Sequence, residues 1–452
     1  MPATSLIQVQ DTPTTADIVP YSPAVTNGVA PLLYGALIDP SAVVQPLSLS
    51  SRPVSLSDLS ALSGVTLLRE LAILPHDQLA SYIASNPRVV DNILASPPAP
   101  AETSAMWNTM SDPDRLNLET AAPRLVGNLD GIPADVRDTA NRAWIPQVQA
   151  QLTSRLNSAS GRAIAEDARH QIHMLGEIQS ALGTSGSIPQ RSLLSVDPTG
   201  QGKAAIVLGD LAHADYVTYM VPGMFFTVDG QIDDWTDDAS RLYDEQVSWL
   251  NLIDKVKPGE AKKTVAVVAW MGYQTPDLTN IGSLDLAYQG RDALARTIEG
   301  LQAERAGTEP YITVVAHSYG STAALMALTE YDFQIDALAL VGSPGSAAQS
   351  VNDLHVRNHN VYVGEAPFDP VPNSAWFGSD PAAPSYGAKK MAVGGGFDAI
   401  TNEFLAPSFG HNDYFGVGTE SMRNMALIGI DHGELVTTGS SSDNRKTLAL
   451  EQ

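Results

Sequence analysis

A stretch of twenty uncharged residues between Glu309 and Glu330 constrains the fold of this chain most strongly. Its length alone would suit a membrane-spanning helix. However, residues Tyr311 to Ala316 form a β-branched apolar run typical of a buried parallel strand, and Ser321 to Leu328 are rich in Ala, Leu and Met, as in a helix. We therefore predict a strand, a sharp turn and a helix here.

The turn itself reads Ala316-His317-Ser318-Tyr319-Gly320. It matches the nucleophile elbow G-x-S-x-G, with Ala in place of the first Gly. Such a turn lifts the serine hydroxyl clear of the sheet and aims the N–H groups of the following helix at a developing oxyanion. Ser318 is thus the predicted nucleophile, and the alternative is a serine that merely ends a strand.

Composition narrows the class of protein. The 452 residues carry 26 basic and 50 acidic side chains, a net charge of −24 that opposes nucleic-acid binding. The absence of Cys excludes disulfides and thiolate metal sites. Because the first basic residue is Arg52, we expect no conventional signal peptide. We expect a soluble protein without an integral membrane segment, either cytoplasmic or exported by another route, and the sequence leaves its oligomeric state open.

Three regions follow from the changing pattern along the chain. Residues 1–50 are rich in Pro, Thr, Ser and Ala and predict an extended arm. Residues 51–190 predict an α-helical domain or cap, whose clearest helix runs from Ile164 to Leu182 and ends at Gly183. Residues 191–452 predict an α/β domain.

Strand and helix patterns alternate in this last region, which predicts a mostly parallel sheet with helices on both faces. The first two strands are too close together for a helical crossover, so we expect them to be antiparallel. The predicted strands are Ser192–Val196, Ala204–Leu208, Tyr216–Val221, Thr264–Trp270, Tyr311–Ala316, Ile335–Val341 and Asn360–Val363. The predicted helices are Ala239–Val256, Ser283–Ala306, Ser321–Tyr331 and Ser346–Leu354.

Ligands of such a sheet bind at the carboxyl ends of its strands. One strand there ends in Pro222-Gly223-Met224-Phe225. The backbone N–H of Met224 or Phe225 could join that of Tyr319 in an oxyanion hole, although the segment also suits an ordinary Pro-Gly turn. Another strand delivers Trp270, Tyr273 and Gln274, which we assign to the substrate pocket, with packing as the alternative role.

The partners of Ser318 are expected on later loops. Asp369 follows the second strand after the elbow, where this fold places its acid, and Glu365 is the local competitor. The histidines beyond it are His411 and His432, and His411 lies in a loop-like segment that suits the general base. The order Ser318, Asp369, His411 is the one this fold requires. His317 is excluded as the base because a neighbour in the elbow points away from the serine hydroxyl.

Metal sites receive little support from the sequence. His170 and His173 have ligand-like spacing, but no third ligand is near them in the sequence. The acidic run at residues 229–238 lacks the register of a Ca²⁺ loop and suits helix capping. The run Gly394-Gly395-Gly396 is followed by no Lys, so it is no phosphate loop. We expect no metal and no organic cofactor.

Several motifs together resemble the bacterial α/β-hydrolase proteins grouped under the domain of unknown function DUF1023. The resemblance covers roughly residues 107–416 and implies an α/β-hydrolase fold preceded by a helical region, with Ser318, Asp369 and His411 in the triad positions. It implies no substrate. The motifs are Gly127-Asn128-Leu129-Asp130-Gly131-Ile132-Pro133, Arg137-Asp138, Ala140-Asn141-Arg142, Val221-Pro222-Gly223, Ala269-Trp270-Met271-Gly272-Tyr273, Ala316-His317-Ser318-Tyr319-Gly320-Ser321, Val341-Gly342-Ser343-Pro344-Gly345, Asp369-Pro370, His411 and Tyr414.

These features predict a serine hydrolase of the α/β-hydrolase fold that acts on a small-molecule carboxylic ester through an acyl-enzyme. Amides, lactones and thioesters remain open as substrates. Two alternatives stand beside it: a catalytically silent binding or assembly protein on the same scaffold, and a peptidase or acyltransferase that uses the same triad.

Overall fold

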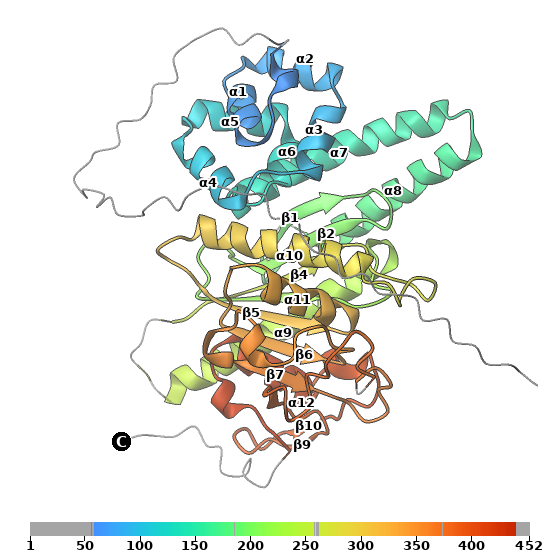
Figure 1. Cartoon of the computed structure of the whole chain (residues 1–452). Helices are drawn as coiled ribbons and strands as arrows, with labels where there is room; N and C mark the ends of the chain where they lie inside the picture. Colours follow the sequence, from blue (N-terminus) through green and yellow to red (C-terminus); the bar gives the residue numbers. More distant parts are fainter. Residues whose placement is uncertain are drawn as a thin grey trace, which may run out of the picture. The chain divides into compact units, whose positions relative to one another are not determined.

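The computed structural model describes residues 56–439, apart from 57, 185, 257, 259–261 and 373. These residues belong to one compact unit. Helices occupy its first part and a large sheet with covering helices occupies the rest (Figure 1). The predicted arm at residues 1–50 lies outside the described residues, and a domain boundary near residue 190 stays a prediction.

Eight α-helices precede the sheet in the part of the chain that the structure describes. The apolar faces of the first six and the start of the seventh meet in a core that includes Leu68, Leu71, Met106 and Leu118, all fully buried. The rest of the seventh helix and the eighth pack in a second core that they share with the sheet. The last two are long and pack against each other (Figure 1). The helices are α1 (Gly64–Ala72), α2 (His76–Ser85), α3 (Arg88–Ala95), α4 (Pro100–Thr109), α5 (Asp112–Ala121), α6 (Pro123–Gly127), α7 (Ala134–Ser158) and α8 (Arg162–Ala181).

Helix α8 matches the predicted amphipathic helix closely. Ala168, Leu175 and Ile178 of the predicted stripe are buried, whereas Ile164 in its first turn is exposed. Gly183 follows with φ +65°, a backbone conformation that glycine adopts without steric cost.

The main sheet has eight strands in the order β1-β2-β4-β3-β5-β6-β7-β8. The pairs β1–β2 and β2–β4 are antiparallel and the other pairs are parallel. This confirms the antiparallel start and the mostly parallel sheet. The strands are β1 (Arg191–Asp197), β2 (Lys203–Gly209), β3 (Tyr216–Val221), β4 (Val265–Met271), β5 (Tyr311–His317), β6 (Ala337–Val341), β7 (Val361–Gly364) and β8 (Lys389–Lys390), and a separate hairpin pairs β9 (Gly396–Phe397) with β10 (Phe404–Leu405).

Four helices cover the two faces of this sheet. Helices α9 (Val228–Val256) and α12 (Glu420–Gly429) share one apolar core with it, and α10 (Asp285–Glu304) and α11 (Tyr319–Glu330) share the other. The uncharged stretch is divided between β5 and α11, as predicted. Among the described residues, no helix combines the length and the apolar character needed to cross a membrane.

Two predicted helices differ from the structure. Residues 346–354 hold only a 3-10 turn at Val351–Asp353, because the backbone of Ser346 pairs with Ser379 and the side chain of Ser350 caps the short turn. Helix α9 begins at Val228 instead of Ala239, with a kink at Asp229 and Gly230. The acidic run that we expected in a loop before the helix therefore forms its first turns.

Polar side chains from α7 and from the loop between α6 and α7 bind the backbone of β1 along its outer edge. The carboxylate of Asp138 accepts from the Leu193 N–H (2.6 Å), and the amide oxygen of Asn128 accepts from the Val196 N–H (2.8 Å). Asn141 donates to the Leu193 carbonyl (3.0 Å). The motif between residues 127 and 142 thus joins the helical region to the sheet.

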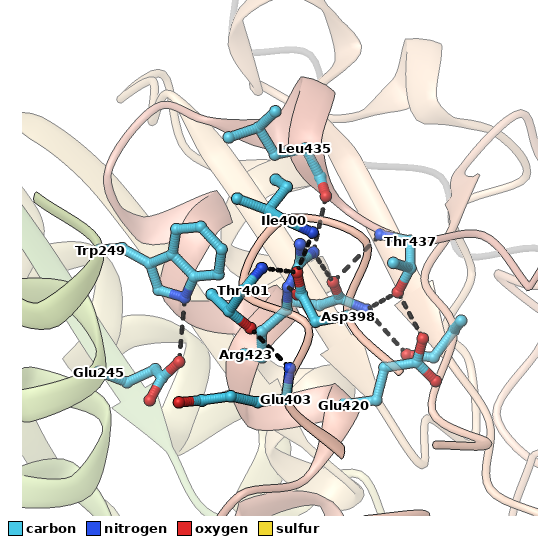
Figure 2. Close-up of polar contacts among 12 residues, drawn as sticks. Glu245, Trp249, Asp398, Ile400, Thr401, Glu403, Glu420, Arg423, Leu435 and Thr437 are labelled. Atoms are coloured by element: carbon cyan, nitrogen blue, oxygen red, sulfur yellow. Dashed lines mark hydrogen bonds and ion pairs between the residues drawn. The ribbon is translucent and has the colours of Figure 1, made fainter. Parts of the chain in front are cut away.

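A buried polar network holds the segment between β8 and the end of the described chain (Figure 2). The guanidinium of Arg423 on α12 donates to the carboxylate of Asp398 at 2.6 Å, and both side chains are almost fully buried. Arg423 also donates to the carbonyl of Leu435 (2.6 Å) and lies over the ring of Trp249. The ion pair joins the two residues that flank the segment 399–422, and this segment contains His411.

We expect Asp398→Ala to lower the free energy of unfolding by about 3–5 kcal/mol, because it leaves the buried guanidinium without its charged partner. Urea denaturation at neutral pH measures this. The control is Arg162→Gln, which removes an ion pair whose side chains are 90% and 54% exposed, and whose loss costs under about 1 kcal/mol. Equal losses in the two variants would contradict the role of the buried pair.

Candidate active site

Ser318 lies at the junction of β5 and α11 in a strained backbone conformation, with φ 53° and ψ −131°. Its N–H donates to the carbonyl of Val341 on the neighbouring strand β6 (3.0 Å). Two glycines leave room for the turn. A Cβ at Gly223 would lie 2.4 Å from the Cβ of Ser318, and one at Gly320 would lie 2.3 Å from the carbonyl oxygen of Pro222. The glycines therefore permit a backbone approach that any side chain would block.

The structure brings Ser318, His411 and Asp369 together from three distant parts of the chain. His411 Nε2 lies 2.7 Å from Ser318 Oγ, and His411 Nδ1 lies 2.9 and 3.0 Å from the two carboxylate oxygens of Asp369. A proton on Nδ1 donates to the carboxylate and leaves Nε2 to accept from the hydroxyl. The sequence predicted these three residues as one group, and they form one hydrogen-bonded chain.

Asp369 is held as an ionised acceptor. Burial by itself would raise the pKa of its carboxyl group, but hydrogen bonds from His411, Tyr414 and the backbone of Val371 hold that pKa below its ordinary value. The hydroxyl of Tyr414 donates to Asp369 Oδ2 at 2.6 Å and accepts from the Ala366 N–H at 2.9 Å. Tyr414 thus ties the carboxylate to the loop after β7.

The competing candidates make other contacts. Burial raises the pKa of Glu365, the alternative acid, with Asp380 as a second cause. His432, the alternative base, pairs with Glu434 at 2.8 Å. No hydrogen bond joins Glu365 or His432 to Ser318 or to His411 among the described residues.

His317 supports the backbone of His411. Its Nε2 donates to the His411 carbonyl at 2.7 Å, and its ring centroid lies 4.7 Å from that of His411. The side chain is buried, and no hydrogen bond joins it to the Ser318 hydroxyl among the described residues. Burial and the neighbouring His411 lower the pKa of His317 to about 3, so its ring is neutral.

The predicted oxyanion-hole donors differ in their availability. The N–H of Tyr319 opens helix α11, so no residue one turn earlier in that helix accepts from it. Phe225, however, donates its N–H to the carbonyl of Pro276 (3.1 Å). The Phe225 N–H is therefore already bonded, and Met224, in the same loop after β3, is the better candidate.

The predicted pocket residues Trp270 and Tyr273 lie on the face of the sheet that α10 and α11 cover. Trp270 and Tyr273 are buried, stack on each other and line a cavity of about 510 Å³ whose remaining walls come mainly from α10 and from residues 91–203. Tyr273 donates to the Pro222 carbonyl at 2.7 Å. Gln274 approaches the turn at Gly200. Ser318 does not line this cavity, so the contacts of Trp270 and Tyr273 match the packing alternative.

Sequence reasoning missed several residues that position the elbow. The hydroxyl of Ser321 contacts both the Ser318 carbonyl (2.6 Å) and Ser343 Oγ (2.7 Å). A Cβ at Gly342 would lie 2.9 Å from Asp369 Oδ2 and 3.0 Å from the ring of His411, so glycine leaves room for both. These positions belong to the motifs of the family resemblance, and that was the only signal available.

Among the described residues, the group that could hold a metal ion is His173, Glu177 and Asp229, which includes no residue of this site.

The strand order, the strained serine turn and the arrangement of Ser, Asp and His define an α/β-hydrolase fold with a potential nucleophile at its elbow. A family model described as alpha/beta hydrolase matches residues 197–379. The match includes Ser318 and Asp369 and ends before His411.

Two relatives come from Mycobacterium tuberculosis strain H37Rv. The uncharacterized protein Rv2079 is 26% identical over 383 residues, which cover 75% of this chain and 56% of the relative. The uncharacterized protein Rv0963c is 27% identical over 227 residues, covering 46% of this chain and 79% of the relative. This chain therefore spans little more than half the length of Rv2079.

Similar solved structures include carboxyl esterase 2 from Tuber melanosporum, with 11% identity and a TM-score of 0.33 over 56% of this chain and 90% of that one. An S-formylglutathione hydrolase from Agrobacterium tumefaciens has 10% identity and a TM-score of 0.32, over 55% and 95%. At these TM-scores the likeness adds nothing to the fold assignment.

The buried, neutral His317 predicts a pH dependence of stability. Because its pKa is about 3 in the folded chain and 6.5 ordinarily, the unfolded state binds more protons between these values. The contribution of neutral His317 to stability is therefore present above pH 6.5 and is lost as the pH drops, by about 2.5 kcal/mol between pH 7 and pH 4.5. Urea denaturation at both pH values checks this.

His317→Gln is the matched variant, since it removes the titrating ring. It is expected to lose less stability than the wild type over the same pH interval. Asp369 acts in the same direction only at lower pH, near and below 3.8, because its pKa is lowered. Equal pH dependence in both proteins would show that His317 does not titrate as described.

Proposed function

We propose that this chain is a serine hydrolase that cleaves carboxylic esters through an acyl-enzyme intermediate. The observation that carries the proposal is the continuous hydrogen-bonded chain from Ser318 Oγ through His411 to Asp369. A serine hydroxyl becomes nucleophilic only beside a base that can take its proton, and the base needs a partner that fixes its tautomer. Both requirements are met in one site.

In the proposed reaction, Ser318 Oγ attacks the ester carbonyl while His411 Nε2 takes the hydroxyl proton. Asp369 stabilises the imidazolium without itself becoming protonated. The tetrahedral intermediate collapses, the C–O bond to the alcohol breaks, and His411 returns the proton to the leaving oxygen. Water, activated by the same histidine, then attacks the acyl-enzyme and releases the acid.

The N–H groups of Tyr319 and Met224 are the proposed donors to the negative oxygen of the intermediate. Tyr319 supplies an N–H from the first turn of α11, where the helix dipole also favours negative charge. Gly223 allows the β3 loop to approach the serine closely. Removal of one such donor typically costs 10²- to 10³-fold in rate.

A fluorophosphonate probe tests the nucleophile. We expect the wild type to be labelled and Ser318→Ala to remain unlabelled, with ester turnover reduced by about 10⁴-fold or more. His411→Ala should behave similarly because the hydroxyl loses its base.

His432→Ala is the control for that base. It should retain labelling, since His432 pairs with Glu434 and forms no hydrogen bond with Ser318 or His411 among the described residues. An unlabelled wild type that is folded by circular dichroism would instead favour the silent scaffold. Amide substrates and alternative acyl acceptors, offered beside the esters, distinguish a peptidase or an acyltransferase.

Exposed aromatic side chains favour an apolar acyl group in the substrate. Five of the nine phenylalanines in the chain are exposed. Phe397 and Phe404 pair in the β9–β10 hairpin, and the other three lie on loops that carry or adjoin residues of the site. Phe225 adjoins Met224, Phe368 immediately precedes Asp369, and Phe409 lies two residues before His411. Phenylalanine is usually buried. Where exposed apolar side chains gather on one surface, that surface is often a binding site. We therefore assign these three as contacts of a hydrocarbon chain.

We expect catalytic efficiency to rise with acyl length in a series of p-nitrophenyl esters from acetate to decanoate. Phe368→Ser removes a side chain that is 90% exposed and should reduce the preference for decanoate over acetate severalfold, because each buried methylene is worth about 0.8 kcal/mol.

The matched control is Leu116→Ser, which removes an exposed apolar side chain on α5. It should leave the preference unchanged. A wild type that hydrolyses the acetate ester best would refute the apolar-substrate assignment and leave the serine mechanism intact.

The resemblance to DUF1023 proteins supports a second proposal. We propose membership on the motifs that carry it, with the alpha/beta hydrolase match over residues 197–379 as support. Because this chain spans 56% of Rv2079, these proposals concern the chain described and not the longer relative.

A further inference from the structure

We propose that four side chains at the junction of α8 and α9 bind a divalent transition-metal ion, with Zn²⁺ as the best match. His170, His173 and Glu177 project from one face of α8, and Asp229 comes from the kinked start of α9. The prediction that no third ligand lies near the two histidines in the sequence is wrong, because Glu177 lies four residues after His173 on the same helix. The fold adds Asp229, which lies 56 residues from His173 along the chain and contacts it directly.

The donor atoms are already close to the spacing of a coordination shell. His173 Nδ1 lies 2.9 Å from Asp229 Oδ1 and 3.8 Å from Glu177 Oε1, and His170 Nδ1 lies 3.4 Å from Asp229 Oδ2. Zinc bonds of about 2.0–2.2 Å place the ligands of a tetrahedral site roughly 3.3–3.6 Å apart. One donor atom each from His173, Glu177 and Asp229 lies within 4.8 Å of the others, so small rotations suffice for these three, and His170 contacts the second oxygen of Asp229.

The chemistry of the set favours a transition metal over Ca²⁺ or Mg²⁺. Imidazole suits Zn²⁺, Cu²⁺ and Ni²⁺, whereas Ca²⁺ and Mg²⁺ prefer oxygen ligands alone. Two neutral imidazoles and two carboxylates also neutralise a divalent ion. Asp233 adds negative charge nearby: burial raises the pKa of its carboxyl group, and Glu177 is among the further causes. A bound cation relieves that repulsion.

An ordinary surface pair looks different. His213 contacts Asp210 at 2.8 Å on the surface, and no second histidine or carboxylate joins that pair among the described residues. In the α8–α9 cluster one carboxylate faces two imidazoles through its two oxygens, and a second carboxylate completes the set. All four side chains are partly exposed, between 24% and 63%, so an ion can reach them from solvent.

The ion would join α8 to the start of α9, and the loop before α9 carries the proposed oxyanion donor Met224. Glu177 already accepts from the Gly230 N–H at 2.6 Å, at the kink where Gly230 has φ +90°. The loop that begins at Gly223 and carries Met224 runs directly into this kink. Coordination therefore pins the far end of that loop to α8, without any part in the chemical step.

Metal binding to the purified full-length chain tests the site. After removal of metal with EDTA, equilibrium dialysis against Zn²⁺ followed by elemental analysis should give one equivalent per chain, together with a rise in melting temperature. Substitution by Co²⁺ should produce the visible absorption of a four-coordinate site. His173→Ala and Glu177→Gln should each weaken binding at least tenfold.

The matched control is His213→Ala, which removes an exposed histidine paired with a carboxylate and should leave binding unchanged. Melting curves of all variants in EDTA verify that each is folded. Failure of the wild type to bind one equivalent, or equal affinity in the double variant His170→Ala/His173→Ala, would overturn the proposal. Labelling of Ser318 by the fluorophosphonate probe in EDTA is a separate readout, so the metal site and the hydrolase proposal stand or fall separately.

Discussion

The backbone of Ser318 is the constraint on which the rest of the structure depends. A non-glycine residue with φ 53° and ψ −131° is strained by about 1–3 kcal/mol and persists only where its surroundings determine it fully. The surroundings are β6, which accepts the Ser318 N–H, and two glycines that let β3 and the elbow approach each other. The contacts with the sheet therefore hold the strained backbone of Ser318, and this backbone places the hydroxyl above the edge of the sheet.

The histidine is placed by quite different means. His411 lies in a long irregular segment, where regular secondary structure cannot fix a side chain. Three contacts replace it: the buried pair of Asp398 and Arg423 closes the base of the segment, His317 holds the His411 carbonyl, and Tyr414 fixes the carboxylate of Asp369. Loops of this kind carry function when a rigid scaffold positions their residues.

The sequence predicted those parts of the fold that depend only on residues close together in the chain. The β-branched run of β5 and the Ala-rich α11 need no distant partner to be recognised, and the order of Ser318, Asp369 and His411 follows from the topology. The prediction failed where distant contacts decide. Residues 346–354 have helical composition, but the pairing of Ser346 with Ser379 overrides it. Likewise, the hydrogen bond from Phe225 to Pro276 and the role of Tyr414 depend on loops that meet only after folding.

The side chains along β1 also limit how this molecule can associate. A bare outer strand offers a row of backbone groups on which another chain can add a strand. Here Asp138, Asn128 and Asn141 already occupy that row. The opposite border, β8, is only the two residues Lys389–Lys390, and paired lysines repel an incoming strand. Neither margin of the main sheet is therefore suited to intermolecular β-pairing, so these two edges would take no part in an association between copies of this chain.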